Sequence, residues 1–95
     1  MSYIVAIHTI TDPEPFWSSA AEAVPNLPAG ISLHATYPQH DGTRAICLWE
    51  ATSVDEIRDM VDAATGSYSS NDYFEVDPAH AGTFGLPSGA SAATS

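Results

Sequence analysis

Four side chains in this chain of 95 residues could carry chemistry, and each lies in or beside a short apolar run typical of a β-strand. They comprise two imidazoles, a thiol and a carboxylate: His8, His34, Cys47 and Glu50. These groups are common protein ligands of divalent transition metals such as nickel and zinc. Imidazole also titrates near neutral pH, as a general base should. Neighbouring strands in one sheet would bring some of these side chains into one cavity.

Strand parity divides this set, because successive side chains of a strand point to opposite faces. Cys47 and Glu50 have opposite parity, so they share a cavity only if a bulge or a strand end intervenes. Cys47 has apolar neighbours and is expected in the core. We therefore predict His8 and His34 as metal ligands, with Glu50 as a supporting ligand. The alternative for Glu50 is a salt bridge with one of the two arginines.

Each histidine also has a purely structural interpretation. His8 has the parity of apolar residues in its run, so it could be a core histidine satisfied by one hydrogen bond. His34 belongs to a polar stripe and could be a solvent-facing residue of an edge strand. His40 and His80 lie near aspartates in polar segments and are expected to be exposed, where metal binding would be weak at most.

The elements that must position these residues follow one another in the order β-α-β-β-α-β. Strands are predicted over residues 3–10, 31–37, 44–51 and 73–76. Pro13 suits the start of the first helix and Pro25 ends it. Ser53 and Glu56 form a capping box at the start of the second helix, and Gly66 is its predicted stop.

This order predicts an α+β, ferredoxin-like fold: a four-stranded antiparallel sheet with two helices on one face. The other face stays uncovered, although the first and third strands are apolar on both sides. A second copy packed sheet to sheet would cover it, which predicts a homodimer of the dimeric α+β barrel type. The domain is expected over residues 1–78. Residues 79–95 are expected to form an arm, containing Phe84 and Leu86, and a flexible tail.

The charge balance excludes several classes of partner. Twelve acidic residues against two basic ones give a net charge of −10, which disfavours binding to nucleic acid or to anionic membranes. The first residues lack the features of a signal peptide, and no apolar run is long enough to span a membrane. We therefore expect a cytoplasmic protein. The acidic surface favours cations electrostatically, but a soluble, self-repelling surface is the preferred explanation for it.

The chain resembles a family of small nickel-binding proteins of ferredoxin-like fold. The resemblance covers residues 3–77 and is carried by three stretches: His34 to Gly42, Cys47-Leu48-Trp49-Glu50-Ala51, and Asn71-Asp72-Tyr73-Phe74-Glu75-Val76. A histidine of the first strand matches His8. Relatives can carry a further histidine in the last strand, where this chain has Phe74. The resemblance implies a homodimer that binds a divalent metal, nickel above all, through histidines that face a cavity.

Three hypotheses for the function follow. The first is a homodimeric protein that binds a divalent transition metal through His8 and His34, with Glu50 in support. The second is a cofactor-free enzyme resembling the monooxygenases and isomerases of the dimeric α+β barrels, which would act on a small apolar substrate with His8 or His34 as general base. The third is an interaction protein with no small-molecule site. Fold alone does not choose among them.

Overall fold

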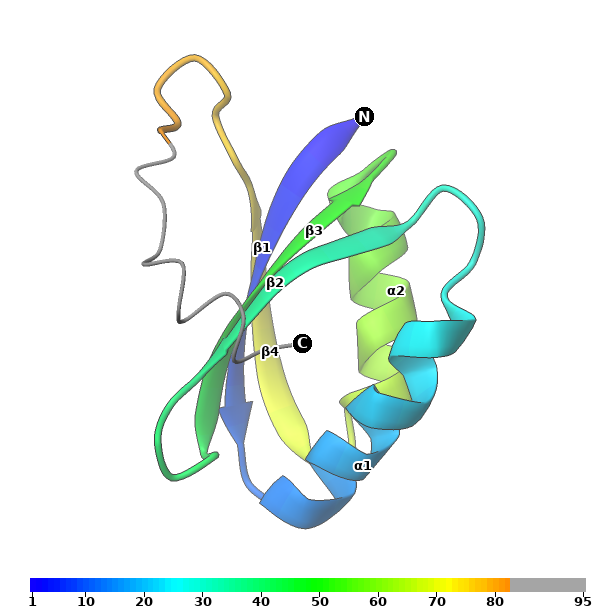
Figure 1. Cartoon of the computed structure of the whole chain (residues 1–95), viewed down its shortest axis with the longest axis vertical. Helices are drawn as coiled ribbons and strands as arrows, with labels where there is room; N and C mark the ends of the chain where they lie inside the picture. Colours follow the sequence, from blue (N-terminus) through cyan, green and yellow to red (C-terminus); the bar gives the residue numbers. More distant parts are fainter. Residues whose placement is uncertain (83–95) are drawn as a thin grey trace.

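The computed structural model describes residues 1–82, and the predicted arm residues Phe84 and Leu86 lie outside this range. Its strands and helices are β1 (Ser2–Ile10), α1 (Pro13–Ala23), a 3-10 turn η1 (Val24–Asn26), β2 (Ser32–Pro38), β3 (Arg44–Ala51), α2 (Val54–Thr65) and β4 (Ser69–Glu75). The strands form one antiparallel sheet in the order β2-β3-β1-β4. This confirms the predicted α+β, ferredoxin-like fold (Figure 1).

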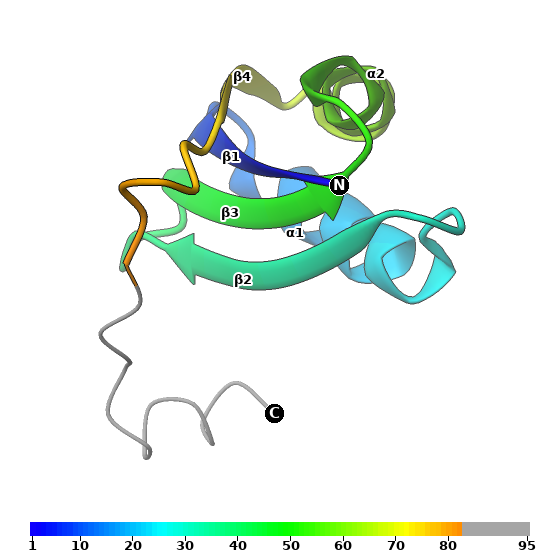
Figure 2. The ribbon, with the colours of Figure 1, turned by 90° about the horizontal axis from the view of Figure 1, so that it is seen from above.

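Both helices lie on the same side of the sheet, which gives the molecule two layers (Figure 2). One face of the sheet therefore looks toward the helices and is called here the inner face. The opposite face, called the outer face, is covered by no helix of residues 1–82. No helix within residues 1–82 is long and apolar enough to cross a membrane.

The helices begin where local chemistry places them. The backbone N–H of Glu56 donates to Ser53 Oγ over 3.2 Å, as the capping box predicts. The Glu56 carboxylate turns back to the backbone N–H of Thr52, one residue earlier than the motif predicts. Helix α1 begins at Pro13 and is held to the β2–β3 hairpin through its next turn, because Trp17 Nε1 donates to the carbonyl of Gly42 over 3.1 Å.

Strand β4 is longer than predicted, since it begins at Ser69 and not near residue 73. Its first half is rich in serine, asparagine and aspartate, which are poor strand formers, so propensity alone indicated a loop. Pairing with β1 overrides that propensity and sets Asn71 directly opposite His8. The extension thus brings a polar side chain next to the buried histidine.

Strand β2 contains an irregularity that changes which face its residues occupy. Leu33 pairs with Trp49, yet Ala35 pairs with Leu48, so His34 is an extra residue between them. Such a β-bulge shifts the alternation by one position. Leu33 therefore lies on the inner face, whereas Ala35 is on the outer face, although a regular strand would put both on one face.

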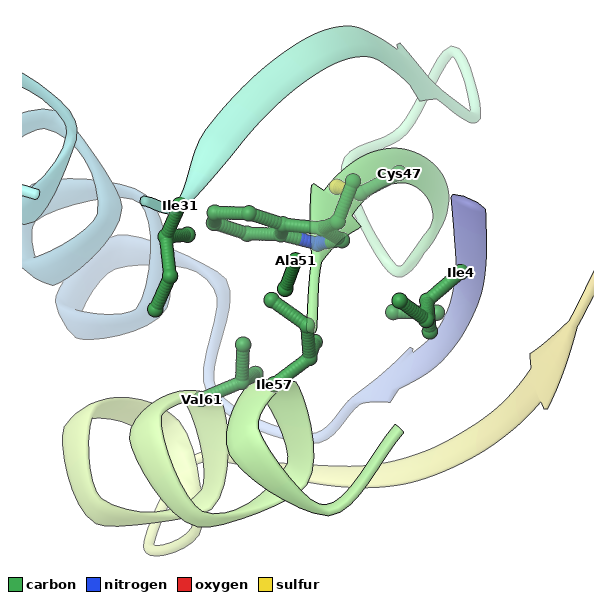
Figure 3. Close-up of a cluster of buried hydrophobic side chains, with 8 residues drawn as sticks. Ile4, Ile31, Cys47, Ala51, Ile57 and Val61 are labelled. Carbon is green, nitrogen blue, oxygen red and sulfur yellow. The ribbon is translucent and has the colours of Figure 1, made fainter. Parts of the chain in front are cut away.

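The main core fills the space between β1, β3 and α2. Figure 3 shows Ile57 and Val61 of α2 directed toward side chains of the strands, including Ile4 and Cys47. Ile4 and Ile57 are completely buried. Full burial of such a side chain contributes about 1.5–3 kcal/mol relative to leaving it exposed. This cluster holds α2 firmly against the sheet.

Candidate functional site

His8 lies in the middle of β1 on the inner face and is 2% exposed. Its ring packs edge-on against Phe16 of α1, with the ring centroids 5.3 Å apart. Its Nδ1 lies 2.7 Å from Oδ1 of Asn71 on the adjacent strand. Burial lowers the pKa of His8, and the Asn71 hydrogen bond and the charge of Asp62 oppose that shift only in part. At neutral pH the ring is therefore uncharged and able to accept a proton.

A hydrogen-bonded chain connects His8 to the surface. The Asn71 side-chain amide donates to Asp62 Oδ1 over 3.0 Å, and the Tyr73 hydroxyl donates to the same oxygen over 2.6 Å. These two donors lower the pKa of Asp62, so its carboxylate is charged at neutral pH. Burial and the Asp62 carboxylate both raise the pKa of Tyr73, which keeps its phenol protonated. Asp62, Asn71 and His8 thus form one continuous polar line.

His8 also lines a cavity of about 400 Å³ between the sheet and the helices. This volume is within the usual range of small-molecule sites. The walls are mainly apolar and come from α1 and η1, from α2, and from the inner faces of β1, β2 and β3. Among the residues that line it are Phe16, Trp17, Ala20, Leu33, Trp49 and Met60.

The cavity exists because helix α1 presents small side chains to it. Ala20, Ala21 and Ala23 line the cavity where leucines would fill it. Helix α2 contributes the small Ala64 beside the larger Met60 and Val61. Ala21 and Ala64 are exposed, so the space opens to solvent between the layers. The alanine-rich stretch of α1 is the sequence signal that could have revealed it.

Few polar groups face this apolar space. Cys47 lines it, and its thiol donates to Thr36 Oγ1 over 3.6 Å. Burial raises the pKa of the Cys47 thiol, so it is neither a thiolate nucleophile nor a ready metal ligand at neutral pH. Trp49 lines the cavity, but its Nε1 is fully buried and has no hydrogen-bond partner in the described part of the chain. His8 is therefore the group best able to act on a molecule in the cavity.

The outer face carries the other predicted site residues. His34 Nε2 lies 2.7 Å from Glu50 Oε1, and the two side chains are 42% and 26% exposed. The bulge in β2 brings His34 beside Glu50, because Ser32 pairs with Glu50 in the register before it. The Tyr3 ring flanks His34 at 5.8 Å between centroids. The alternative for Glu50, a salt bridge with an arginine, is not what the structure forms.

The predicted set of His8, His34 and Glu50 does not form a single site within one copy of the chain. His34 and Glu50 meet on the outer face, whereas His8 points to the inner face. The expectation that both histidines share a cavity was wrong. It was made without knowing which face of the sheet the helices cover, and so which face His8 and His34 each occupy. Among residues 1–82, no three side chains of the His, Cys, Asp and Glu types gather as a metal-holding group.

The outer face is unusually apolar for an uncovered surface. Four large side chains, one from each strand, are close to half exposed there: Tyr3, Tyr37, Ile46 and Phe74. It is also poor in acidic groups. Of the 12 acidic residues in the chain, only Glu50 and Asp72 belong to it by strand parity. Contiguous apolar patches on monomers rarely exceed a few hundred Å².

The residues missed by sequence reasoning are Asn71 and Asp62. The predicted fourth strand began at residue 73 and so left Asn71 out, and no role was predicted for Asp62. A longer β4 would have paired Asn71 with His8. His80 is exposed as predicted, and its Nδ1 lies 2.7 Å from Oδ2 of Asp77, which is also exposed.

Comparisons of this chain with protein-family models, with curated proteins and with solved structures found no match. The resemblance to small nickel-binding proteins stays a prediction.

Proposed function

We propose that this protein binds a small apolar substrate in the cavity between the sheet and the helices, with His8 as general base. The observation that carries the proposal is a neutral, buried imidazole at the edge of an apolar cavity of about 400 Å³. A mostly apolar pocket with a few convergent polar groups and a perturbed pKa is the usual form of a small-molecule site.

Both parts of the proposal have physical support. The apolar walls favour a ligand of low polarity, because each buried Å² of apolar surface contributes about 25 cal/mol. The lowered pKa keeps His8 unprotonated at neutral pH, which is the state that a base requires. Of the two histidines considered as bases, His8 is preferred, since His34 is exposed and lines no comparable cavity.

The test is binding of 1-naphthol, a two-ring probe, followed by NMR titration of the ¹⁵N-labelled protein. Ala20→Leu adds bulk to the cavity wall and should weaken binding at least about tenfold, because the added side chain occupies the ligand's space. Ala63→Leu makes the same change at an exposed position of α2 outside the cavity and should leave affinity unchanged. Equal affinity for both variants, or no binding to the wild type, would contradict the proposal.

A second proposal concerns the outer face, where two copies of the chain pack sheet to sheet as a homodimer. The four strands of seven to nine residues cover about 500 Å² of flat sheet. Side-chain relief and adjoining loops raise this toward the roughly 800 Å² that each partner of a stable complex buries. A second copy is the favoured occupant, because the acidic groups of this strongly negative chain lie almost entirely elsewhere.

The His34–Glu50 pair gives this dimer a candidate site for a divalent metal, nickel being the ion that the family resemblance implies. One copy supplies two donors, fewer than the four to six that nickel takes up. Two copies supply two imidazoles and two carboxylates, a nitrogen and oxygen set that suits nickel, provided that both pairs meet at the two-fold axis. His8 has no part in this site.

Two measurements test the second proposal. Analytical ultracentrifugation should give a dimer at micromolar concentration, and Ile46→Glu should give a monomer, because it places a charge on the apolar outer face. Equilibrium dialysis should retain about one nickel ion per dimer. His34→Ala should abolish retention, whereas His40→Ala, at an exposed histidine of the hairpin, should not. A wild-type monomer, or nickel retained by His34→Ala, would contradict it.

A further inference from the structure

The orientation of the His8 ring is fixed by a residue that does not touch the cavity. Asp62 is a carboxylate, which only accepts hydrogen bonds. The Asn71 side chain must therefore turn its nitrogen toward Asp62, and its Oδ1 is left facing His8. Ser69 is compatible with this orientation, since its hydroxyl lies 2.8 Å from the same Oδ1 and can donate to it.

The Asn71 oxygen in turn decides which nitrogen of His8 carries the proton. An oxygen acceptor 2.7 Å from Nδ1 requires the proton to be on Nδ1. In the neutral ring Nε2 is then unprotonated and carries a lone pair that can accept a hydrogen bond. Within residues 1–82, Nε2 has no hydrogen-bond partner, and His8 is one of the residues that line the cavity. Nε2 is thus the ring nitrogen left free to bind a ligand there.

We propose that Asp62 and Asn71 are positioning residues that hold His8 as a hydrogen-bond acceptor toward the cavity, so that the cavity selects an apolar ligand with one O–H or N–H donor. This inference rests on the proposed function of the cavity. The ligand's donor bonds to Nε2, and its remaining surface packs on the apolar walls. A ligand with only an acceptor at that position faces the Nε2 lone pair and is disfavoured.

The same geometry describes the proton transfer. When the ligand donates its proton, the O–H or N–H bond breaks, its electron pair stays on the ligand, and Nε2 forms the new N–H bond. The resulting imidazolium keeps its Nδ1–H bond to Asn71, and the negative charge of Asp62 lies at the far end of the chain. No other reactant is needed.

The first test needs no ligand and no variant. Long-range proton–nitrogen NMR spectra of the ¹⁵N-labelled protein show which ring nitrogen of His8 is protonated. We expect the Nδ1–H form alone at neutral pH. A ring protonated at Nε2, or an even mixture of the two forms, would overturn the inference, while the proposal that the cavity binds a ligand would stand.

The second test compares three probes of nearly identical ring shape: 1-naphthol, 1-methoxynaphthalene and naphthalene. The first carries a donor, the second only an acceptor and the third neither. We expect 1-naphthol to bind about threefold to tenfold more tightly than the other two, which is the range of a neutral hydrogen bond. Equal affinities would overturn the inference alone. Failure of all three probes to bind would overturn the proposed function as well.

The third test removes the charge that sets the orientation. In Asp62→Asn the new side chain can donate or accept, so Asn71 can turn either way. We expect the spectra to show both tautomers of His8. The ratio of the affinities for 1-naphthol and 1-methoxynaphthalene should fall toward one. Asp59→Asn removes a charge from the same helix at an exposed position with no bond to Asn71, and it should behave as the wild type. An unchanged tautomer and preference in Asp62→Asn would overturn the role of Asp62.

Discussion

The two faces of one sheet hold a histidine each, in opposite environments. On the inner face His8 is 2% exposed, uncharged and held by Asn71 beside an apolar cavity. On the outer face His34 is 42% exposed and paired with Glu50, among apolar side chains that no helix covers. The two proposals accordingly assign proton transfer to the histidine of the inner face and metal binding to that of the outer face. Strand parity and one bulge in β2 decide which face each histidine occupies.

The largest expected contrast between the faces is in stability. Ile4→Ala on the inner face should lower the free energy of unfolding by about 2–5 kcal/mol, because a fully buried side chain is lost. Ile46→Ala on the outer face, where the side chain is 46% exposed in a single copy, should cost about 1 kcal/mol or less in dilute solution. Urea unfolding measures both losses.

Protein concentration sharpens this contrast. If a second copy covers the outer face, the loss caused by Ile46→Ala should grow with protein concentration, since the dimer stabilises the folded state by mass action. The loss caused by Ile4→Ala should not depend on concentration in this way. Equal losses for the two variants in dilute solution would mean that the faces are not different in burial, contrary to the structure.

The next contrast is in pH dependence. The pKa of His8 is lower in the folded protein than its ordinary value of 6.5, so the unfolded chain binds a proton there more readily. Stability should therefore fall as pH drops below 6.5 toward the folded pKa, by at most about 1.4 kcal/mol per pH unit. The difference in unfolding free energy between wild type and His8→Gln should carry this slope. A difference that is flat from pH 7.5 to 5 would contradict it.

How much of this comparison the sequence could predict depends on the regularity of each strand. Strand β3 is regular, so parity correctly separated Cys47 from Glu50 and put Cys47 in the core. Strand β2 is interrupted at His34, and a bulge changes the parity without a clear mark in the amino acids. Which face of the sheet the helices cover also had to be known before His8 could be placed.

The polar network was beyond sequence reasoning for a related reason. Asn71 belongs to a run of turn-forming residues that becomes a strand only by pairing with β1. Asp62 is one of several acids on α2, and nothing in its spacing separates it from Asp55 or Asp59. Tertiary pairing selects it, because the register of β4 brings Asn71 and Tyr73 within hydrogen-bonding distance of its carboxylate.

A smaller effect should follow from filling the inner cavity. Ala20→Leu, which should weaken binding of a ligand, should also stabilise the free protein by about 0.5–2 kcal/mol, as cavity-filling changes often do. The leucine buries new apolar surface between α1 and the sheet. Thermal unfolding should show the gain, and the exposed control Ala63→Leu should not. A destabilised Ala20→Leu protein would mean that the space is too narrow for a larger side chain and would weaken the case for a ligand there.

The smallest effect concerns two tryptophans, one with an unpaired indole N–H and one whose indole N–H is hydrogen-bonded. Trp49 Nε1 is buried without a partner, which costs about 1–3 kcal/mol. Trp49→Phe removes that cost and loses ring contacts, so its net effect on stability should be within about 1 kcal/mol. Trp17 Nε1 donates to the Gly42 carbonyl, so Trp17→Phe should destabilise the protein more, although Trp17 is less buried. The inner face thus leaves Trp49 Nε1 unpaired while it pairs Nδ1 of His8. A larger loss of stability in Trp49→Phe than in Trp17→Phe would show that Trp49 Nε1 has a partner in solution.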